Sequence, residues 1–218
     1  MSVTQETKVK KGRGRPKLFD REQALDRALE LFWAHGYEAT SLADLVAATG
    51  AKAPTLYAEF ENKEGLFRAV MERYVEMFSA QRNATLQCKE SGVATGIENY
   101  FRSTAACFTD RDKPAGCFFI CTSTALSADS EEIADMLRKK HRSQEATLNA
   151  FLQERKALGE LAEATDTAAL SRYLTCVLQG MSVRAREGAD RAELDGIVDT
   201  LMQLWPMLSG VCHQKTGR

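Results

Sequence analysis

The sequence predicts an all-α protein, with a small helical domain at the amino terminus and a larger helical domain after it. Apolar residues recur at helical spacing along most of the 218 residues, and no segment has the convincing alternation of a half-buried strand. Gly50 and Pro54 divide residues 40–63 into two short helices with a tight turn between them. These observations set the fold class, and each expected helix has its own start and stop signals.

The first helix is expected between Asp20 and Gly36. Asp20 is a suitable N-cap, because its carboxylate can accept hydrogen bonds from the free amides of the first turn, and Gly36 is a typical stop. The apolar stripe between them consists of Ala24, Leu25, Ala28, Leu29, Leu31 and Phe32. This helix supplies a surface on which the next two can pack.

Two short helices follow. Thr40 or Ser41 can cap the first, and Gly50 ends it in a left-handed conformation that costs glycine nothing. Pro54 lies in the first turn of the second, where its missing amide would be unpaired anyway. Two helices joined by a glycine-containing turn form a helix-turn-helix, whose second helix enters the DNA major groove. Their core positions are expected to be Leu45, Leu56 and Phe60.

A longer amphipathic helix is expected to begin after Asn62 with Lys63 in its first turn. Its apolar positions are Leu66, Phe67, Val70, Met71, Tyr74, Val75 and Phe78. Together with the first helix it gives the helix pair a small core of its own.

Residues 18–78 resemble the amino-terminal domain of the TetR family of bacterial transcriptional repressors. The specific pieces are Gly36, Tyr37 and Thr40, the helix pair around Gly50, and the series Thr55, Leu56, Tyr57, Phe60 and Lys63. The resemblance implies four parts: a basic arm (1–17), a DNA-binding domain (18–78), a helical effector-binding and dimerisation domain (79–210) and a tail (211–218). It also implies a repressor that a small-molecule inducer releases from operator DNA by changing the separation of two DNA-reading heads.

The residue types divide the DNA contacts by chemistry. Lys52 and Thr55 can reach base edges, Ala53 and Pro54 offer apolar contact to thymine methyl groups, and the Tyr57 hydroxyl can bind a phosphate. Thr40, Ser41 and Lys63 stand at helix starts, which suit phosphate oxygens. Glu59 on the same helix adds repulsion. The expected contacts, including two arginines of the arm, are Arg13, Arg15, Thr40, Ser41, Lys52, Ala53, Pro54, Thr55, Tyr57 and Lys63.

The amino-terminal arm concentrates positive charge although the whole chain has a net charge of -1. Residues 1–17 hold six lysines and arginines against Glu6 alone, with few apolar residues to bury. Such an arm strengthens DNA binding by counterion release, and its arginines suit a narrow minor groove. The alternative is a plain solubilising tail.

The carboxyl-terminal part predicts a dimer. Two rich apolar stripes near the end of the chain offer more apolar surface than one small domain covers, and helix pairs commonly bury it in a four-helix bundle with a partner. The expected interface consists of Leu170, Leu174, Val177, Leu194, Ile197, Leu201, Leu204 and Trp205. A homodimer also matches a palindromic operator.

An apolar helix over residues 116–126 is expected to line a ligand pocket, because it mixes aromatic, thiol and hydroxyl groups. The candidate pocket residues are Phe101, Thr104, Phe108, Cys117, Phe118, Cys121, Tyr173 and Met181. The alternative is an ordinary core helix in which Cys117 and Cys121 act as small apolar residues. A sharper hypothesis makes Cys117, near a helix amino terminus, a thiol sensor of oxidants or electrophiles, with Cys121 or Cys107 as its resolving partner.

Other function classes find little support. The three histidines form no metal or nucleophile constellation, and no phosphate loop or hydrolase motif is present, so the sequence predicts no enzyme, metal or cofactor. No run of 18 apolar residues or signal peptide occurs, and the six cysteines form no disulfide scaffold, which favours a cytoplasmic protein without a membrane partner. A nonspecific architectural DNA-binding protein is the remaining rival to a regulator.

Overall fold

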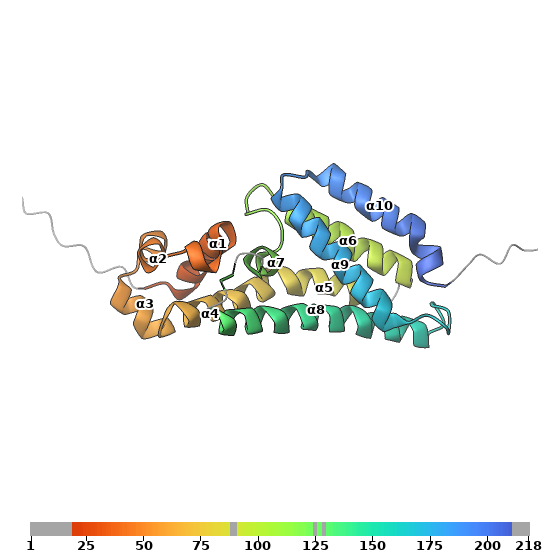
Figure 1. The fold of residues 1–218 in the computed structure, drawn as a ribbon, viewed down its shortest axis with the longest axis horizontal. Coiled ribbons are helices and arrows are strands. Elements are labelled where there is room, and N and C mark those ends of the chain that lie inside the picture. The colour runs from red at the N-terminus through yellow and green to blue at the C-terminus, as the bar shows by residue number, and fades with distance from the viewer. Residues whose placement is uncertain (1–18, 88–90, 124–125, 128–129, 211–218) are drawn as a thin grey trace, which may run out of the picture.

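The computed structural model describes residues 19–87, 91–123, 126–127 and 130–210, and this part of the chain contains helices and no strand (Figure 1). The all-α prediction is therefore confirmed. The amino-terminal helices are α1 (Arg21–Ala39), α2 (Leu42–Thr49), α3 (Ala53–Phe60) and α4 (Lys63–Tyr74). The carboxyl-terminal helices are α6 (Val93–Phe108), α7 (Phe118–Ser123), α8 (Glu131–Ala157), α9 (Thr167–Arg186) and α10 (Arg191–Leu208).

Local signals account for the ends of the amino-terminal helices. Asp20 accepts a hydrogen bond from the Gln23 amide at 3.0 Å, as an N-cap should. Gly50 ends α2 with φ of 68°, where a side chain would be strained. Gly36 breaks the helix with φ of 82° and ψ of 172°, as predicted, and a short helical segment after this kink extends α1 to Ala39.

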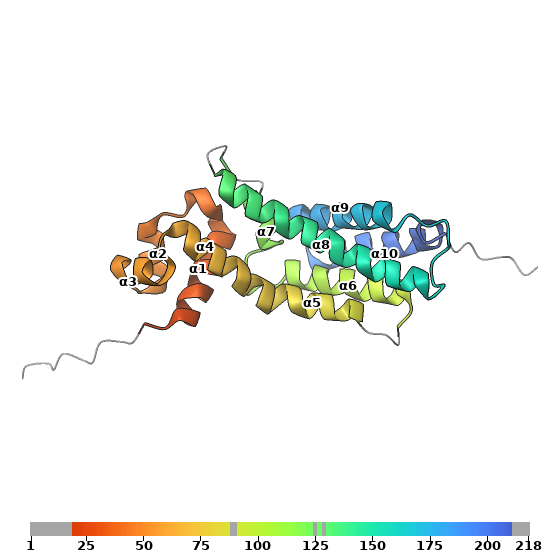
Figure 2. The same ribbon diagram turned by 90° about the horizontal axis from the view of Figure 1, so that it is seen from below.

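Helix α4 continues into the second part of the molecule as one long rod (Figures 1 and 2). The rod comprises α4, a π-helical turn η1 (Val75–Ser79), α5 (Ala80–Ala84) and a closing 3₁₀ turn η2 (Thr85–Gln87). The proposed boundary between residues 78 and 79 lies inside this rod. The DNA-reading part and the carboxyl-terminal part therefore share a helix.

The π turn shifts the buried side of the rod by one residue. The inward positions step from Val70 and Tyr74 to Ser79, and then to Arg82 and Leu86. A regular α-helix would place the next inward residue four positions after Tyr74, at Phe78, whereas the π turn inserts one extra residue. Ser79 consequently faces the interior, and Arg82 follows on the same buried side.

The carboxyl-terminal helices pack around the end of the rod. Helix α8 packs on α9, α10 packs on α6, and the short α7 lies between α1, α8 and α9. The rings of Trp33 and Tyr74 lie 5.1 Å apart, and Phe118 of α7 packs against both. One apolar core therefore runs from the amino-terminal helices into the second part.

One expectation about this part needs correction. Of the expected 116–126 helix, the structure describes Phe118–Ser123 as helical, because Pro114 and Gly116 lie in a bend that places Cys117 just before the first helical residue. Helix α8 is continuous over 27 residues, and Arg138, Lys139 and Arg142 of its basic run are exposed to solvent. None of the helices described is both long enough and apolar enough to cross a membrane.

Candidate DNA-binding interface and effector core

The helix-turn-helix consists of α2, a turn over residues 50–52, and α3. Leu45, Leu56 and Phe60 are buried against α1 and α4, as predicted. Lys52 is the N-cap residue of α3 and makes no side-chain capping bond, and Pro54 stands in the first turn. The packing of one side of α3 leaves the opposite side free for a ligand.

The outward side of α3 carries most of the predicted base-contacting residues. Lys52 and Pro54 are exposed, Ala53 and Thr55 are half-buried, and Tyr57 is 45% exposed with its hydroxyl available. Glu59 does not simply repel DNA as expected, because Arg21 forms an ion pair with it at 2.7 Å and also stacks on the Phe60 ring. A cation from α1 thus neutralises the acidic residue of the recognition helix.

The two polar residues before α2 differ from the expectation. The Thr40 side chain is buried and its hydroxyl donates to the Gly36 carbonyl at 2.7 Å, so it is not available to a phosphate. Ser41 is exposed, but it forms a reciprocal capping box with Asp44. These hydrogen bonds lower the pKa of Asp44, whose carboxylate therefore already occupies the start of α2. A phosphate at this point would meet a negative charge.

Lys63 is held at the first position of α4. Its Nζ lies 4.3 Å from the centre of the Tyr37 ring, which is a cation–π contact between two residues of the family pattern. Burial lowers the pKa of Lys63, while the nearby Glu38 opposes that shift. The lysine is therefore presented in one place beside the recognition helix. Arg13 and Arg15 lie outside the described residues.

The predicted pocket residues differ in how deeply they are buried. Six of them belong to the continuous core and are buried, namely Phe101, Thr104, Phe108, Cys117, Phe118 and Met181. Cys121 is half-buried, and burial raises the pKa of its thiol. Tyr173 was wrongly placed with them, because it points away from the core and is 41% exposed.

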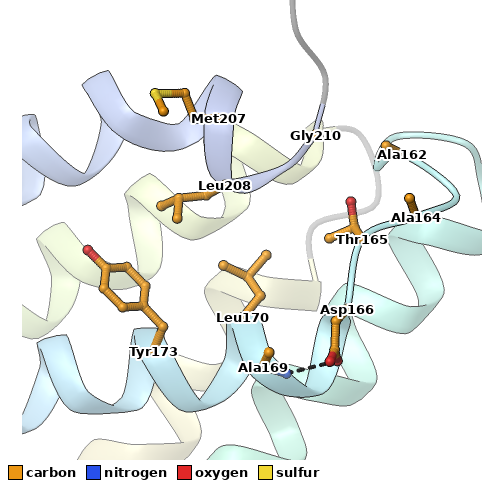
Figure 3. A pocket seen from close by; sticks show the side chains of 10 residues that line it. All are labelled: Ala162, Ala164, Thr165, Asp166, Ala169, Leu170, Tyr173, Met207, Leu208 and Gly210. Atoms are coloured by element: carbon orange, nitrogen blue, oxygen red, sulfur yellow. Dashed lines mark hydrogen bonds between the residues drawn. The ribbon is translucent and has the colours of Figure 1, made fainter.

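Tyr173 instead lines a surface hollow between α9 and α10. Figure 3 shows its ring beside Leu170 and Leu208, with Met207 on the facing helix. The hollow is open to solvent at the ends of the two helices. It is a feature of the surface rather than of the buried core.

The predicted interface residues on α9 and α10 also divide by burial. Leu170, Leu174, Leu194, Leu201 and Trp205 are buried within the chain itself, so they stabilise its own core rather than face a partner. Val177 and Ile197 are half-buried, and Leu204 is 40% exposed. The helical stripes were identified correctly, but they contain the inward face as well as the outward one.

Sequence reasoning missed a buried arginine in the core. Arg82 stands on the inward side of the rod, 5% exposed, beside Tyr74, Tyr100 and Cys117. The available signal was its position four residues after Phe78 on the apolar stripe of the fourth helix. A charged residue in that phase is unusual, because burying an unpaired charge is costly.

Comparisons with known proteins agree with this architecture. Residues 24–70 match the family described as bacterial regulatory proteins, tetR family, and residues 93–201 match the tetracyclin repressor-like C-terminal domain. The chain is 56% identical over 200 residues to the HTH-type transcriptional repressor ComR of Escherichia coli (strain K12), covering 92% of this chain and 95% of that protein. It is 30% identical to the HTH-type transcriptional regulator YezE of Bacillus subtilis (strain 168), covering 88% and 98% of the two chains.

A solved structure extends the comparison to three dimensions. The chain is similar to the TetR family transcriptional regulator CifR, as a cysteine mutant in complex with 26-bp double-strand operator DNA, with a TM-score of 0.84 and 33% identity over 88% of this chain and 100% of that one. The two family matches together span both parts of the fold, and the relatives are regulators rather than enzymes. The chain therefore belongs to the TetR family of bacterial regulatory proteins and is a DNA-binding transcriptional repressor of that family.

Proposed function

We propose that this repressor acts in the cytoplasm, binds a palindromic operator as a homodimer and leaves it when a small molecule binds the carboxyl-terminal core. The observation that carries the proposal is the rod from Lys63 to Gln87, which joins the DNA-reading head to that core without a flexible linker. A change in the core therefore acts mechanically on the head. A ligand releases DNA if it binds the non-binding arrangement more tightly.

A second link supports this coupling. Arg186, at the end of α9, donates to the carbonyl oxygens of Trp33 at 3.3 Å and Ala34 at 2.5 Å. Trp33 and Ala34 belong to α1, on which the helix-turn-helix rests. The head is thus attached to the carboxyl-terminal part through both α4 and α1.

The proposed DNA contacts are those that remain available on the outward side of the head. Lys52, Thr55 and Pro54 would meet base edges, and Tyr57 and Lys63 would bind phosphates. Ser41 is retained as a weaker phosphate contact because of Asp44, and Thr40 is not. A recognition helix with one cation relies in addition on the arginines of the arm.

The proposed dimer surface, here called the α9–α10 face, is the exposed side of these two helices. Its large members are Tyr173, Val183, Leu204 and Met207, which are between 40% and 76% exposed. Cys176, Gly180 and Gly196 lie at the same helical phase and let a second helix approach closely. Four helices from two chains would bury this face as a bundle.

Selection from random duplex DNA tests the DNA-binding proposal. The protein should enrich a short palindrome, and fluorescence anisotropy should give tight binding to it and weak binding to scrambled DNA. Lys52→Ala should weaken specific binding by about tenfold or more, because one good base contact is worth roughly 1–3 kcal/mol. Lys139→Ala, an exposed lysine on α8, is the matched control. Failure to enrich any sequence would favour a nonspecific architectural protein.

A thiol sensor centred on Cys117 is the second candidate, because the Cys117 Sγ accepts a hydrogen bond from the Tyr74 hydroxyl at 3.6 Å. The Cys117 amide also donates to Ser182 Oγ at 2.8 Å, which fixes the residue at the start of α7. Opposing this function, the residue is only 2% exposed, and α7 is too short to act strongly through its dipole.

The thiol hypothesis has a direct test with a matched control. Quinones, aldehydes or hypochlorous acid should release the protein from operator DNA, and Cys117→Ser should prevent that release. Cys176→Ser changes an exposed thiol on α9 and should leave the release intact. Unchanged release from the Cys117→Ser variant would rule the sensor out.

A further inference from the structure

Arg82 is a buried cation that has no carboxylate partner among the residues that the structure describes. Its Nη2 donates to Ser79 Oγ at 3.5 Å, whereas its Nε and Nη1 have no hydrogen-bond partner among the described residues. No ion pair links it to any aspartate or glutamate of the described part of the chain. The side chain therefore presents two unused donor groups to the interior.

The groups around Arg82 do not supply the missing negative charge. Burial raises the pKa of the Tyr74 hydroxyl and of the Cys107 thiol, so both are neutral at neutral pH. The Arg82 guanidinium lies 5.7 Å from the centre of the Tyr100 ring, and the Tyr100 hydroxyl accepts from Gln144 Nε2 at 3.3 Å. An aromatic ring and neutral hydroxyls reduce the free-energy cost of burying the Arg82 charge, but they do not neutralise that charge.

We propose that Arg82 is the anchor of an effector site for a small organic carboxylate. A guanidinium binds a carboxylate through two parallel hydrogen bonds, and its two free donors suit such a ligand. The rings of Tyr74 and Tyr100 would pack against a compact apolar or planar body. This inference rests on the proposed release by an inducer and names the chemical class of that inducer.

The position of Arg82 connects this site to the DNA-reading head. Among the described residues, the Arg82 side chain donates its hydrogen bond to Ser79, the last residue of the π turn, and α4 ends at Tyr74 on the other side of that turn. A π turn is an uncommon and adjustable element that often occurs at functional sites. A carboxylate that draws the guanidinium away from Ser79 would relax the turn and rotate α4 with its head.

Binding of matched acids and amides to the free protein tests the site. Acetate, propionate and benzoate, exchanged for chloride at constant ionic strength, should raise the melting temperature, whereas acetamide, propionamide and benzamide should not. Arg82→Met should weaken binding of the stabilising carboxylate by about tenfold or more, and Arg82→Lys by less, because lysine keeps the charge but loses the fork. Arg142→Met, an exposed arginine on α8, should change nothing.

The result of this experiment is independent of operator binding. Carboxylates that stabilise Arg82→Met as much as the original protein, or that act no better than their amides, would overturn the proposal. Iodoacetamide labelling of Cys117 below pH 7 that disappears in Arg82→Met would also overturn it, because a thiolate would then be the partner of the arginine. Failure to bind any operator would contradict the proposed function and leave the carboxylate result unaffected.

Discussion

At the scale of single residues, the DNA-reading head depends on contacts that fix a few side chains in place. The Lys63 ammonium lies over the Tyr37 ring. Arg21 forms an ion pair with Glu59, which reduces the repulsion between that carboxylate and DNA. The sequence indicated Tyr37 and Lys63 separately through the family resemblance, but not their contact. Pairings of this kind depend on the angle between helices, which periodicity does not encode.

The packing of α3 on α4 leaves no room for a side chain at Gly65. A Cβ at this position would stand 2.0 Å from the Phe60 carbonyl oxygen, where α3 meets the first turn of α4. Gly65→Ala should therefore push α3 away and lower the free energy of unfolding by about 1–3 kcal/mol. The melting temperature should fall by roughly 2–4 °C for each kcal/mol.

A second glycine substitution separates this clash from a general effect of adding a side chain to a glycine. Gly92→Ser places a good capping residue at the start of α6, where the nearest atom lies 3.7 Å from the new Cβ, and should be neutral or slightly stabilising. Equal melting temperatures for the Gly65→Ala variant and the original protein would contradict the packing argument.

Glu38 connects the end of α1 to the segment before α8 and predicts a pH dependence. Hydrogen bonds from Ser130 and Ser127 lower the pKa of Glu38 below its ordinary value of 4.5. Stability from this carboxylate is therefore present above pH 4.5 and is lost as the pH falls through the lowered pKa. Glu38→Gln should be less stable than the original protein at pH 7, and the difference in melting temperature should shrink below pH 4.5. A difference independent of pH would point to shape rather than charge.

At the scale of helices, the sequence predicts starts and stops better than interior irregularities. Asp20, Ser41, Gly50 and Pro54 act as the capping rules require, because caps are local interactions between neighbouring residues. The π turn was not predicted, since a one-residue slip in hydrogen bonding leaves the apolar pattern almost unchanged. The buried Arg82 lies four residues after Phe78 on the apolar stripe, and it was missed because a charged side chain is not expected in an apolar core.

Deleting one residue of the π turn tests its role. Removal of Met77, which is 39% exposed, should convert η1 to regular α-helix while the flanking residues keep their inward and outward sides. Circular dichroism should report unchanged helix content, and operator binding should no longer respond to the carboxylate that binds Arg82. Met77→Ala keeps the turn and should keep the response. If the carboxylate still released the deletion variant from operator DNA, that result would contradict a switch at this turn.

At the scale of the whole molecule, the predicted interface on α9 and α10 mixes core positions with surface positions, and Leu204 is the residue that it shares with the large residues of the proposed α9–α10 face. Leu174 and Leu194 have no exposed surface, whereas Leu204 and Met207 on α10 lie open to solvent. Helical spacing identifies an apolar stripe, but its division between a core and a partner depends on how the other helices pack. The proposed interface therefore lies on the outward side of each helix, whereas most of the predicted interface residues lie on the inward side.

Charge on the α9–α10 face tests the dimer. The double variant with Leu204→Glu and Met207→Glu should sediment as a folded monomer at micromolar concentration, because paired carboxylates would have to be buried in the bundle. Leu158→Glu, at the end of α8, changes a residue that is 64% exposed and should leave a dimer. A dimer for the double variant would remove this face as the interface.

Removal of residues 1–17 tests the contribution of the arm, which lies outside the described residues. The truncated protein should bind operator DNA more weakly, with a shallower dependence of affinity on salt. Each lost phosphate contact should reduce the slope of log K against log salt by about 0.9. An unchanged slope would assign the arm to solubility alone.

Hydroxyl-radical footprinting on the selected operator tests whether the repressor reads DNA with two heads. Two protected patches related by a dyad should appear, with their centres one helical turn, about 10–10.5 bp, apart or a multiple of it. Both patches should disappear together in the Leu204→Glu and Met207→Glu double variant. Protection of a single half-site at full affinity, or protection without a fixed position, would contradict reading by two heads.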